Sequence, residues 1–294
     1  MTELTSAKFV AEGTSEGQPV ACYDLTLPEN DDTAELAGWL ELIRVDYFET
    51  RGSDPSAIVA VVVAPSTSIV DYGLRFVAAA GPLGGCGEAT LFATYACTNP
   101  DVYPSVTFET SGGQIVGSNL GSGRIAIQMP AVAPASVVQQ VEYEDEFLRI
   151  RSVTAGGNRF AAVSADDLGI RFDQPSLDEL TVTGSDLLRR LRRRASTSSE
   201  QQAPDMLLIT EPVAGSSTRS AVIWGDSVLN RGPCGTGTCV RYVLAVEDGD
   251  VSPGSHLVHE SPFGYSFEAH SIAVGADSTT DGLNIVLSGV VEMV

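Results

Sequence analysis

Positive charge is scarce in this sequence, and lysine is almost absent. Seventeen Lys and Arg residues stand against 38 Asp and Glu residues, which gives a formal net charge of −21. A surface this acidic repels polyanions, so we expect no nucleic-acid partner. The excess of acidic residues suits a cytoplasm of high salt concentration. A simpler explanation of the composition is a GC-rich genome, which encodes arginine in place of lysine.

The single lysine, Lys8, restricts the available chemistry. A pyridoxal phosphate enzyme needs a lysine for its Schiff base, and Lys8 lies near the start of the sequence in a segment without strong periodicity. A phosphate-binding loop of the Gly-Lys-Ser/Thr type is missing as well. We therefore expect no pyridoxal phosphate cofactor.

Long apolar runs and a secretory leader are also missing. The longest apolar run, Ala57–Pro65, is far shorter than the roughly 20 residues that a bilayer requires. The first ten residues lack the basic region and apolar stretch of a signal peptide. We expect a cytoplasmic protein with no membrane partner. Its 294 residues, 43% of them apolar, suffice for two domains of about 150 residues.

The five cysteines form no C-x-x-C pair, which disfavours a zinc site and a disulfide framework. His256 and His259 lie three apart in a strand-like segment, where they would point to opposite faces and make a poor metal pair. We therefore predict no metal site. Free thiols remain, and two of them have unusual surroundings.

Short strand patterns alternate with a few helical patterns, which predicts an α+β fold. Gly and Pro break the chain before Cys86 and again before Cys234, and a helical pattern follows each break. The predicted strands are Phe9–Leu27 with a turn at 15–19, Ala57–Val63, Leu74–Ala80, Ser105–Thr110, Gln114–Val116, Arg124–Gln128, Glu146–Val153, Phe160–Val163, Leu207–Thr210 and Ser220–Trp224. The predicted helices are Thr33–Ile43, Cys86–Cys97, Ser185–Arg194 with Ser185 as its N-cap, and Thr238–Glu247.

The two breaks introduce similar segments about half the chain apart. Cys86–Thr90 (CGEAT) and Cys234–Thr238 (CGTGT) share Cys, Gly and Thr in register, and both open an apolar helical stretch. An internal duplication would give two similar domains, each with one cysteine at a helix N-terminus.

That placement has a chemical meaning. The positive end of the helix dipole favours a thiolate and binds anions such as a substrate carboxylate. Two such thiols that face one carbon could invert it without a cofactor, since one removes the α-proton and the other protonates the opposite face. A single cysteine is more often a small core residue. That simpler interpretation applies to Cys22, Cys97 and Cys239.

A basic run, Arg189–Arg194 (RRLRRR), ends the third predicted helix. Cations there complement the helix dipole, and the rest of the chain is strongly acidic. We interpret the run as a solvated face or a set of intramolecular salt bridges rather than a nucleic-acid site.

Several segments resemble the proline racemase family. Asn230–Thr238 (NRGPCGTGT) closely resembles the family's second cysteine motif, and Gly85–Thr90 (GCGEAT) is similar to its first. Gly156–Ala161 (GGNRFA) with Asp167–Gly169 (DLG), and His259–Ser261 (HES), match two further segments. Gly17–Pro19 at the start and Gly264 and Phe267 at the end match as well, so the matches run in order from near residue 13 to about residue 270.

The resemblance implies an α+β fold shared with diaminopimelate epimerase. Two pseudo-symmetric domains would each form a curved mixed or antiparallel sheet around a central helix, with the active site in the interdomain cleft. We expect one domain from residues 1–128 plus 276–294, carrying Cys86, and one from residues 129–275, carrying Cys234. Homodimers are common in the family.

The resemblance also implies an isomerase, a racemase or epimerase independent of pyridoxal phosphate that inverts proline or a hydroxyproline. Cys86 and Cys234 would be the acid and base. Family members that dehydrate 3-hydroxyproline typically carry threonine at the place of Cys234, so two thiols favour inversion. The residues implied in substrate binding are Gly87, Glu88, Asn230, Gly235 and Thr236.

Three residues depart from the family pattern. Glu88 stands where the family has histidine, Asn230 where it has aspartate, and Arg159 where it has an aromatic residue. We hypothesise that Glu88 pairs with the substrate ammonium, that Asn230 is a neutral partner, and that Arg159 accepts a further acidic group. A dehydratase or isomerase of another small amino or carboxylic acid, or a catalytically silent ligand-binding protein, stays open.

Overall fold

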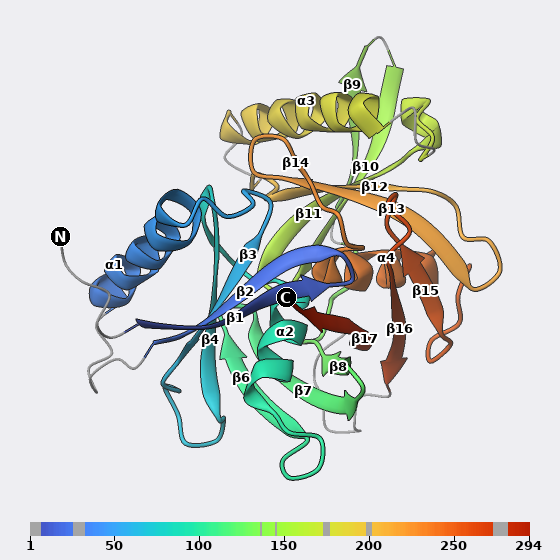
Figure 1. Ribbon diagram of the computed structural model, residues 1–294. Helices are drawn as coiled ribbons and strands as arrows, with labels where there is room; N and C mark the ends of the chain where they lie inside the picture. The colour runs from blue at the N-terminus through green and yellow to red at the C-terminus, as the bar shows by residue number, and fades with distance from the viewer. Residues whose placement is uncertain are drawn as a thin grey trace. The chain divides into compact units, whose positions relative to one another are not determined.

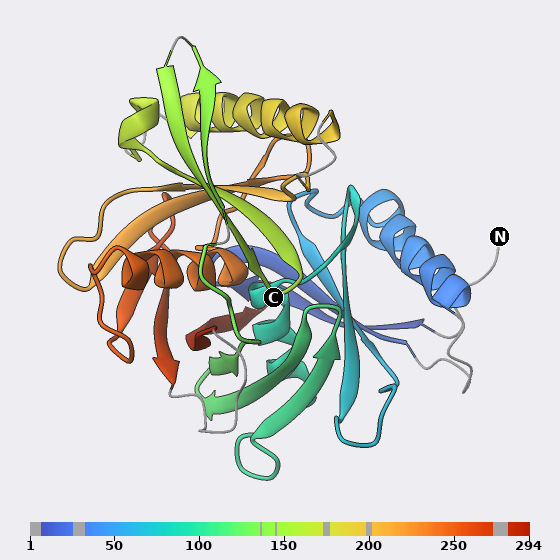
Figure 2. The same ribbon diagram turned by 180° about the vertical axis from the view of Figure 1, so that it is seen from behind.

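The chain divides into two compact units. The computed structural model describes residues 7–25, 33–135, 137–144, 146–172, 177–197, 202–272 and 282–294 (Figures 1 and 2). Unit 1 is Met1–Gln128 with Ser288–Val294, and unit 2 is Met129–Leu287. The domain boundary expected between residues 275 and 276 lies outside the described residues. Within the described ranges, no helix is both long and apolar enough to cross a membrane.

The strands of unit 1 form a mixed sheet that closes on itself. They are β1 (Ala7–Ser15), β2 (Gln18–Leu25), β3 (Ile58–Val63), β4 (Tyr72–Ala78), β5 (Gly81–Leu83), β6 (Ser105–Thr110), β7 (Gly113–Gly121), β8 (Arg124–Gln128) and the later part of β17 (Asn284–Met293). The pairs β1–β2, β3–β4, β4–β5, β6–β7 and β7–β8 are antiparallel, while β2–β3 and β4–β6 are parallel. β17 pairs with both β1 and β8, which closes the ring.

Two helices cover the two faces of this sheet. α1 (Thr33–Arg44), followed by a π-helical turn at Val45–Thr50, packs its apolar side against alternate residues of β3, among them Val59 and Val61. The other face of β3 meets α2 (Gly87–Cys97), whose residues from Gly87 to Thr94 are all buried. A strand that is buried on both faces has a continuous apolar sequence, which explains the sequence IVAVVV of β3.

Unit 2 repeats the same order of elements. Its strands are β9 (Val137–Tyr143), β10 (Glu146–Ala155), β11 (Asn158–Ser164), β12 (Met206–Thr210), β13 (Ser217–Trp224), β14 (Val228–Leu229), β15 (Leu257–Glu260) and β16 (Ser266–Ile272). The pairs β10–β11, β12–β13, β13–β14 and β15–β16 are antiparallel, while β11–β12 and β13–β15 are parallel. This is the sequence of pairings from β1 to β7, with β9 added at the edge of β10.

The helices of unit 2 also lie on opposite faces of their sheet (Figure 1). α3 (Leu177–Ser196) packs on the face that includes Ala221 and Ile223 of β13. α4 (Gly235–Glu247) lies on the other face, where Val222 faces it, and its residues from Gly235 to Ala245 are all buried. A short 3-10 turn spans Asp166–Leu168. The helix that carries each cysteine motif is therefore the buried one in its unit.

The structure corrects the predicted start of the third helix. Ser185 is not an N-cap: α3 begins eight residues earlier, and Ser185 lies inside it, buried and without a hydrogen-bond partner for its Oγ. Thr181, Val182 and Gly184 are poor helix formers, so the sequence suggested a later start. Packing of Leu180 into the core stabilises the first turns of the helix. The helix also ends two residues later than predicted, at Ser196 instead of Arg194.

Candidate active site

Cys86 is the N-cap of α2, as the helical pattern predicted. Its backbone is extended (φ −151°, ψ 117°), and its sulfur accepts a hydrogen bond of 3.4 Å from the N–H of Ala89. The first helical hydrogen bond runs from the N–H of Thr90 to the carbonyl of Cys86. Gly87 and Glu88 therefore occupy the first turn, where the backbone N–H groups point toward the N-terminal end. A donor to the sulfur and the positive helix end both favour a thiolate.

Glu88 is a buried acidic residue beside this thiol. Its side chain is 1% exposed, and the Sγ of Cys86 lies 3.5 Å from its Oε2, with the thiol as donor. An acidic residue in the first turn is also favoured by the helix dipole. An acidic side chain is rarely buried to this extent without partners that compensate it.

Cys234 is the N-cap of α4 and has an unusual backbone. Its φ of 62° and ψ of 110° are outside the range that non-glycine residues ordinarily adopt. Its sulfur accepts a 3.4 Å hydrogen bond from the N–H of Gly237 and lies 3.6 Å from the hydroxyl of Thr236. Strained residues of this kind cluster at catalytic sites, where the surrounding structure holds them in place.

Two glycines allow close packing around Cys234. A Cβ on Gly237 would lie 2.9 Å from Val222 and 3.3 Å from the Cys234 sulfur. Gly156, in the β10–β11 turn, has a φ of +55°, and a Cβ there would lie 2.8 Å from the side chain of Thr236. The GGN segment noted in the sequence therefore packs directly on the first turn of α4.

Asn230 lies in the loop between β14 and α4, and it is buried. Its amide donates to the carbonyl of Gly232 at 3.0 Å, and its Oδ1 accepts from the indole of Trp224 at 3.2 Å. Asn230 therefore holds the shape of the loop that leads into Cys234.

A buried polar chain supports the same helix, and we did not anticipate it from the sequence. Thr238 donates to the carbonyl of Cys234 at 2.9 Å and lies 2.7 Å from the Nδ1 of His259, whose Nε2 contacts Ser220. His259 is fully buried, and this burial, together with the charge of Arg241, lowers its pKa to about 3. The ring is therefore neutral at physiological pH. The signal in the sequence was the HES segment, considered there only as part of a resemblance and as a poor metal ligand.

Each unit thus gathers its own predicted residues. Cys86, Gly87 and Glu88 form the N-terminal turn of α2. Cys234, Gly235 and Thr236 form that of α4, with Asn230 in the loop before it. Within the described ranges, no group of three or more His, Cys, Asp or Glu residues is placed to hold a metal ion.

The three remaining cysteines are packing residues. Cys239 is fully buried within α4, and burial raises the pKa of Cys22 well above its ordinary value. Burial also raises the pKa of Cys97, at the end of α2, to about 11. None of the three is an N-cap, so none has the helix dipole as a source of thiolate stabilisation.

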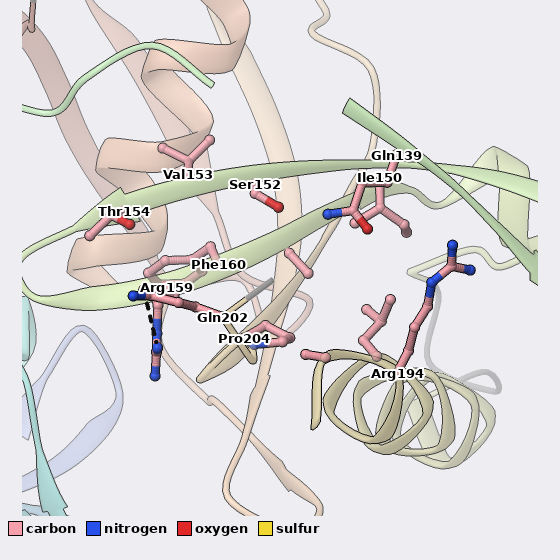
Figure 3. Close-up of a pocket in the computed structure, with 13 residues that line it drawn as sticks. Gln139, Ile150, Ser152, Val153, Thr154, Arg159, Phe160, Arg194, Gln202 and Pro204 are labelled. Atoms are coloured by element: carbon pink, nitrogen blue, oxygen red, sulfur yellow. Dashed lines mark hydrogen bonds between the residues drawn. The ribbon is translucent and has the colours of Figure 1, made fainter. Parts of the chain in front are cut away.

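Arg159 does not have the environment that we expected. It forms a two-pronged ion pair with Asp205, with bonds of 2.9 and 3.0 Å, and a weaker contact with Gln202. It lines a cavity of about 350 Å³ between α3 and the sheet of unit 2, with Arg194 at the opposite end (Figure 3). Because an acidic side chain already neutralises Arg159, it gives no support for an additional acidic group on a substrate.

The basic run at the end of α3 makes intramolecular contacts. Arg189 and Arg190 pair with Asp186, and Arg190 also lies over the ring of Tyr143. Arg192 donates to three backbone carbonyls, those of Pro204, Asp205 and Gly225. These contacts confirm the salt bridges proposed from the sequence.

Comparison with known proteins gives matches along most of the chain. Residues 40–291 match the family described as proline racemase. The chain is 25% identical over 245 residues to the proline racemase of Clostridioides difficile, covering 76% of this chain and 72% of that protein. It is 27% identical over 238 residues to a 4-hydroxyproline 2-epimerase of Spirosoma linguale, covering 75% and 70%.

The fold resembles that of a solved hydroxyproline epimerase from Agrobacterium vitis with bound trans-4-hydroxy-L-proline. The TM-score is 0.80 and the identity 16%, and the match covers 99% of this chain and 90% of that one. At this identity the likeness shows the fold alone.

Proposed function

The chain belongs to the proline racemase family, and we therefore propose that this isomerase inverts the α-carbon of proline or a hydroxyproline with the thiols of Cys86 and Cys234. One observation carries the proposal. Each thiol is the N-cap of a buried helix, and each accepts a hydrogen bond from the backbone N–H three residues later. Two relatives, a proline racemase and a 4-hydroxyproline epimerase, agree with this substrate class.

The proposed reaction consists of two proton transfers, one to a thiolate and one from the other thiol. A thiolate takes the α-proton, and the electron pair of the broken C–H bond moves into the carboxylate. The second thiol then donates a proton to the opposite face of the same carbon. The two cysteines finish with their protonation states exchanged, so the reverse direction uses the same groups.

The chief barrier is the weak acidity of the α-hydrogen, because negative charge accumulates on the carboxylate as the proton leaves. Backbone N–H donors fixed before the reaction stabilise that charge. The proposed donors are the amides of Gly87 and Glu88 on α2 and of Gly235 and Thr236 on α4. No cofactor enters the proposal.

Incubation with L-proline and trans-4-hydroxy-L-proline in D2O tests the proposal. Proton NMR should show loss of the α-hydrogen signal, and polarimetry should show inversion. Replacing either cysteine, as Cys86→Ser or Cys234→Ser, should lower kcat by about 10²- to 10⁴-fold, the range for a lost general acid or base. Cys97→Ala is the control and should retain activity.

Three other outcomes would contradict the proposal. Exchange without inversion would indicate a single working thiol. A keto or enamine product would indicate a dehydratase. No exchange with any cyclic amino acid would favour a ligand-binding protein or another substrate.

Glu88 has a separate proposed role, which is to hold the substrate ammonium. Glu88→Gln should raise KM strongly, since it removes the charge but keeps the size and hydrogen-bonding groups. Asn230→Asp is the companion variant, and it should disturb the loop because Asn230 donates to a carbonyl. If Glu88→Gln binds and turns over normally, the role assigned to Glu88 is wrong.

A further inference from the structure

The backbone of Cys234 needs support that the backbone of Cys86 does not. Cys234 has a positive φ of 62°, whereas Cys86 is extended at −151°. A left-handed φ disfavours a residue that carries a Cβ. Yet both cysteines present their sulfur to an N–H in the first turn of a helix. Something specific to unit 2 must therefore hold the Cys234 peptide in place.

The carbonyl of Cys234 is the point at which it is held. It accepts from the N–H of Thr238 at 2.7 Å and from the hydroxyl of Thr238 at 2.9 Å. Cys86 has the corresponding pair of bonds from Thr90. What differs is the next contact, because the Thr238 hydroxyl lies 2.7 Å from a fully buried histidine ring.

The hydrogen-bond pattern assigns the tautomer of that ring. The single hydroxyl proton of Thr238 is used on the Cys234 carbonyl, so the His259 Nδ1 must be the donor to Thr238. A neutral ring with its proton on Nδ1 accepts at Nε2, and the Ser220 hydroxyl supplies that bond. The chain therefore runs in one direction, from Ser220 through His259 and Thr238 to the backbone of Cys234.

We propose that His259 is a positioning residue for Cys234: through Thr238 it holds the strained N-cap peptide, and thereby aims this sulfur and leaves Cys86 unaffected. The inference rests on the proposed function, in which Cys234 is an acid–base catalyst. His259 itself touches no reacting atom in this scheme. It acts on one of the two thiols, which gives the test an internal reference.

The experiment measures alkylation of both cysteines in the same sample. Wild type, His259→Asn and His259→Leu are treated with iodoacetamide, and peptide mass spectrometry follows the rate at each sulfur. The leucine variant has no donor at the Nδ1 position, so its rate at Cys234 should fall about tenfold, the loss expected for one buried hydrogen bond. Asparagine keeps a donor there and should restore most of the rate, with Cys86 unchanged in both variants.

Two further measurements separate positioning from a general structural role. Nitrogen-15 NMR of the wild type should show a protonated Nδ1 and an unprotonated Nε2. In steady-state kinetics, His259→Leu should lower kcat with little change in KM. An equal loss of reactivity at both cysteines, no loss at Cys234, or a protonated Nε2 would each overturn the proposal.

These readouts also distinguish this inference from the proposed function. Alkylation and NMR need no turnover. An inactive wild type with the expected Cys234 effect would refute only the racemase proposal. If the wild type is active but replacement of His259 leaves the alkylation rate of Cys234 unchanged, only the positioning role is refuted.

Discussion

At the scale of single residues, a comparison of Gly156 with Gly169 separates two reasons why a position requires glycine: a positive φ and close packing. The φ of Gly156 is +55°, and a Cβ would meet Thr236 at 2.8 Å. Gly169 has a similar φ of +63° but nothing within 4 Å of a Cβ. Replacement by alanine should therefore lower the free energy of unfolding by about 1 kcal/mol at both positions, through backbone strain.

Only Gly156→Ala should also impair catalysis. Displacement of Thr236 moves the first turn of α4, and small misplacements of catalytic groups can lower rates by up to about 10²-fold. We expect kcat/KM to fall at least tenfold for Gly156→Ala and to stay near wild type for Gly169→Ala. Steady-state kinetics of the two variants checks this, and equal effects would contradict the packing argument.

His259 predicts a pH dependence of stability. Its pKa is lowered to about 3 in the folded protein, mainly by burial, while the unfolded chain protonates near the ordinary value of 6.5. Below pH 6.5 the unfolded state therefore binds a proton that the folded state does not. The free energy of unfolding should fall by about 2 kcal/mol from this residue between pH 7 and pH 5.

Denaturant titrations of wild type and His259→Asn isolate this contribution, because the other titrating groups are shared. The variant should lose less stability than wild type between pH 7 and pH 5. Parallel losses would show that His259 does not carry this part of the pH dependence.

The sequence identified the cysteine motifs because their chemistry lies in contiguous residues. The family resemblance drawn from Cys86–Thr90 and Cys234–Thr238 is confirmed. The backbone strain at Cys234 and the support from His259 could not be predicted, since they depend on β15 and β13 lying beside α4. The ion pair of Arg159 could not be predicted for the same reason, because its partner Asp205 is distant in sequence.

At the scale of elements, α3 shows how packing overrides local preference. Gly184 sits inside this helix, and a Cβ there would lie 2.1 Å from Ile223 and 3.1 Å from Ile209. The glycine therefore lets the helix approach the sheet closely. Gly38 in α1 is also inside a helix, but nothing lies within 4 Å of its Cβ position.

Alanine at these two positions should have opposite effects. Gly38→Ala should stabilise the protein by about 0.5–1 kcal/mol through helix propensity. Gly184→Ala should destabilise it by about 1–2 kcal/mol, because overpacking outweighs the same gain. Denaturant unfolding measures both, and stabilisation by Gly184→Ala would show that the helix can move away from the sheet without loss.

Strands buried on both faces were the easiest elements to predict. β3 and β12 are continuous apolar runs, and the sequence placed both. β5 was predicted as a break, because Gly81-Pro82-Leu83 has no strand preference of its own and forms only by pairing with β4. β9, β14, β16 and β17 were not predicted from the sequence.

At the scale of the whole molecule, the net charge of −21 predicts a response to salt. Like charges repel more in the compact state than in the extended chain. The screening length falls from about 8 Å at 0.15 M salt to about 3 Å at 1 M. The midpoint of thermal unfolding should therefore rise with KCl, by about 2–4 °C for each kcal/mol of repulsion relieved.

Differential scanning calorimetry in KCl, NaCl and LiCl at equal ionic strength checks this prediction. The same rise in all three chlorides would indicate screening. A midpoint that stays constant, or that depends on the cation used, would show that the charge is not the main source of the effect.

The later residues of β17, from Ser288 on, belong to unit 1, although they follow all of unit 2 in the chain. It lies between β1 and β8, and its Val291 donates to the carbonyl of Gly123. During synthesis on the ribosome, the edges of β1 and β8 therefore stay unpaired until β17 has been made. The sheet of unit 1 can therefore close only after residues that follow unit 2 have been made.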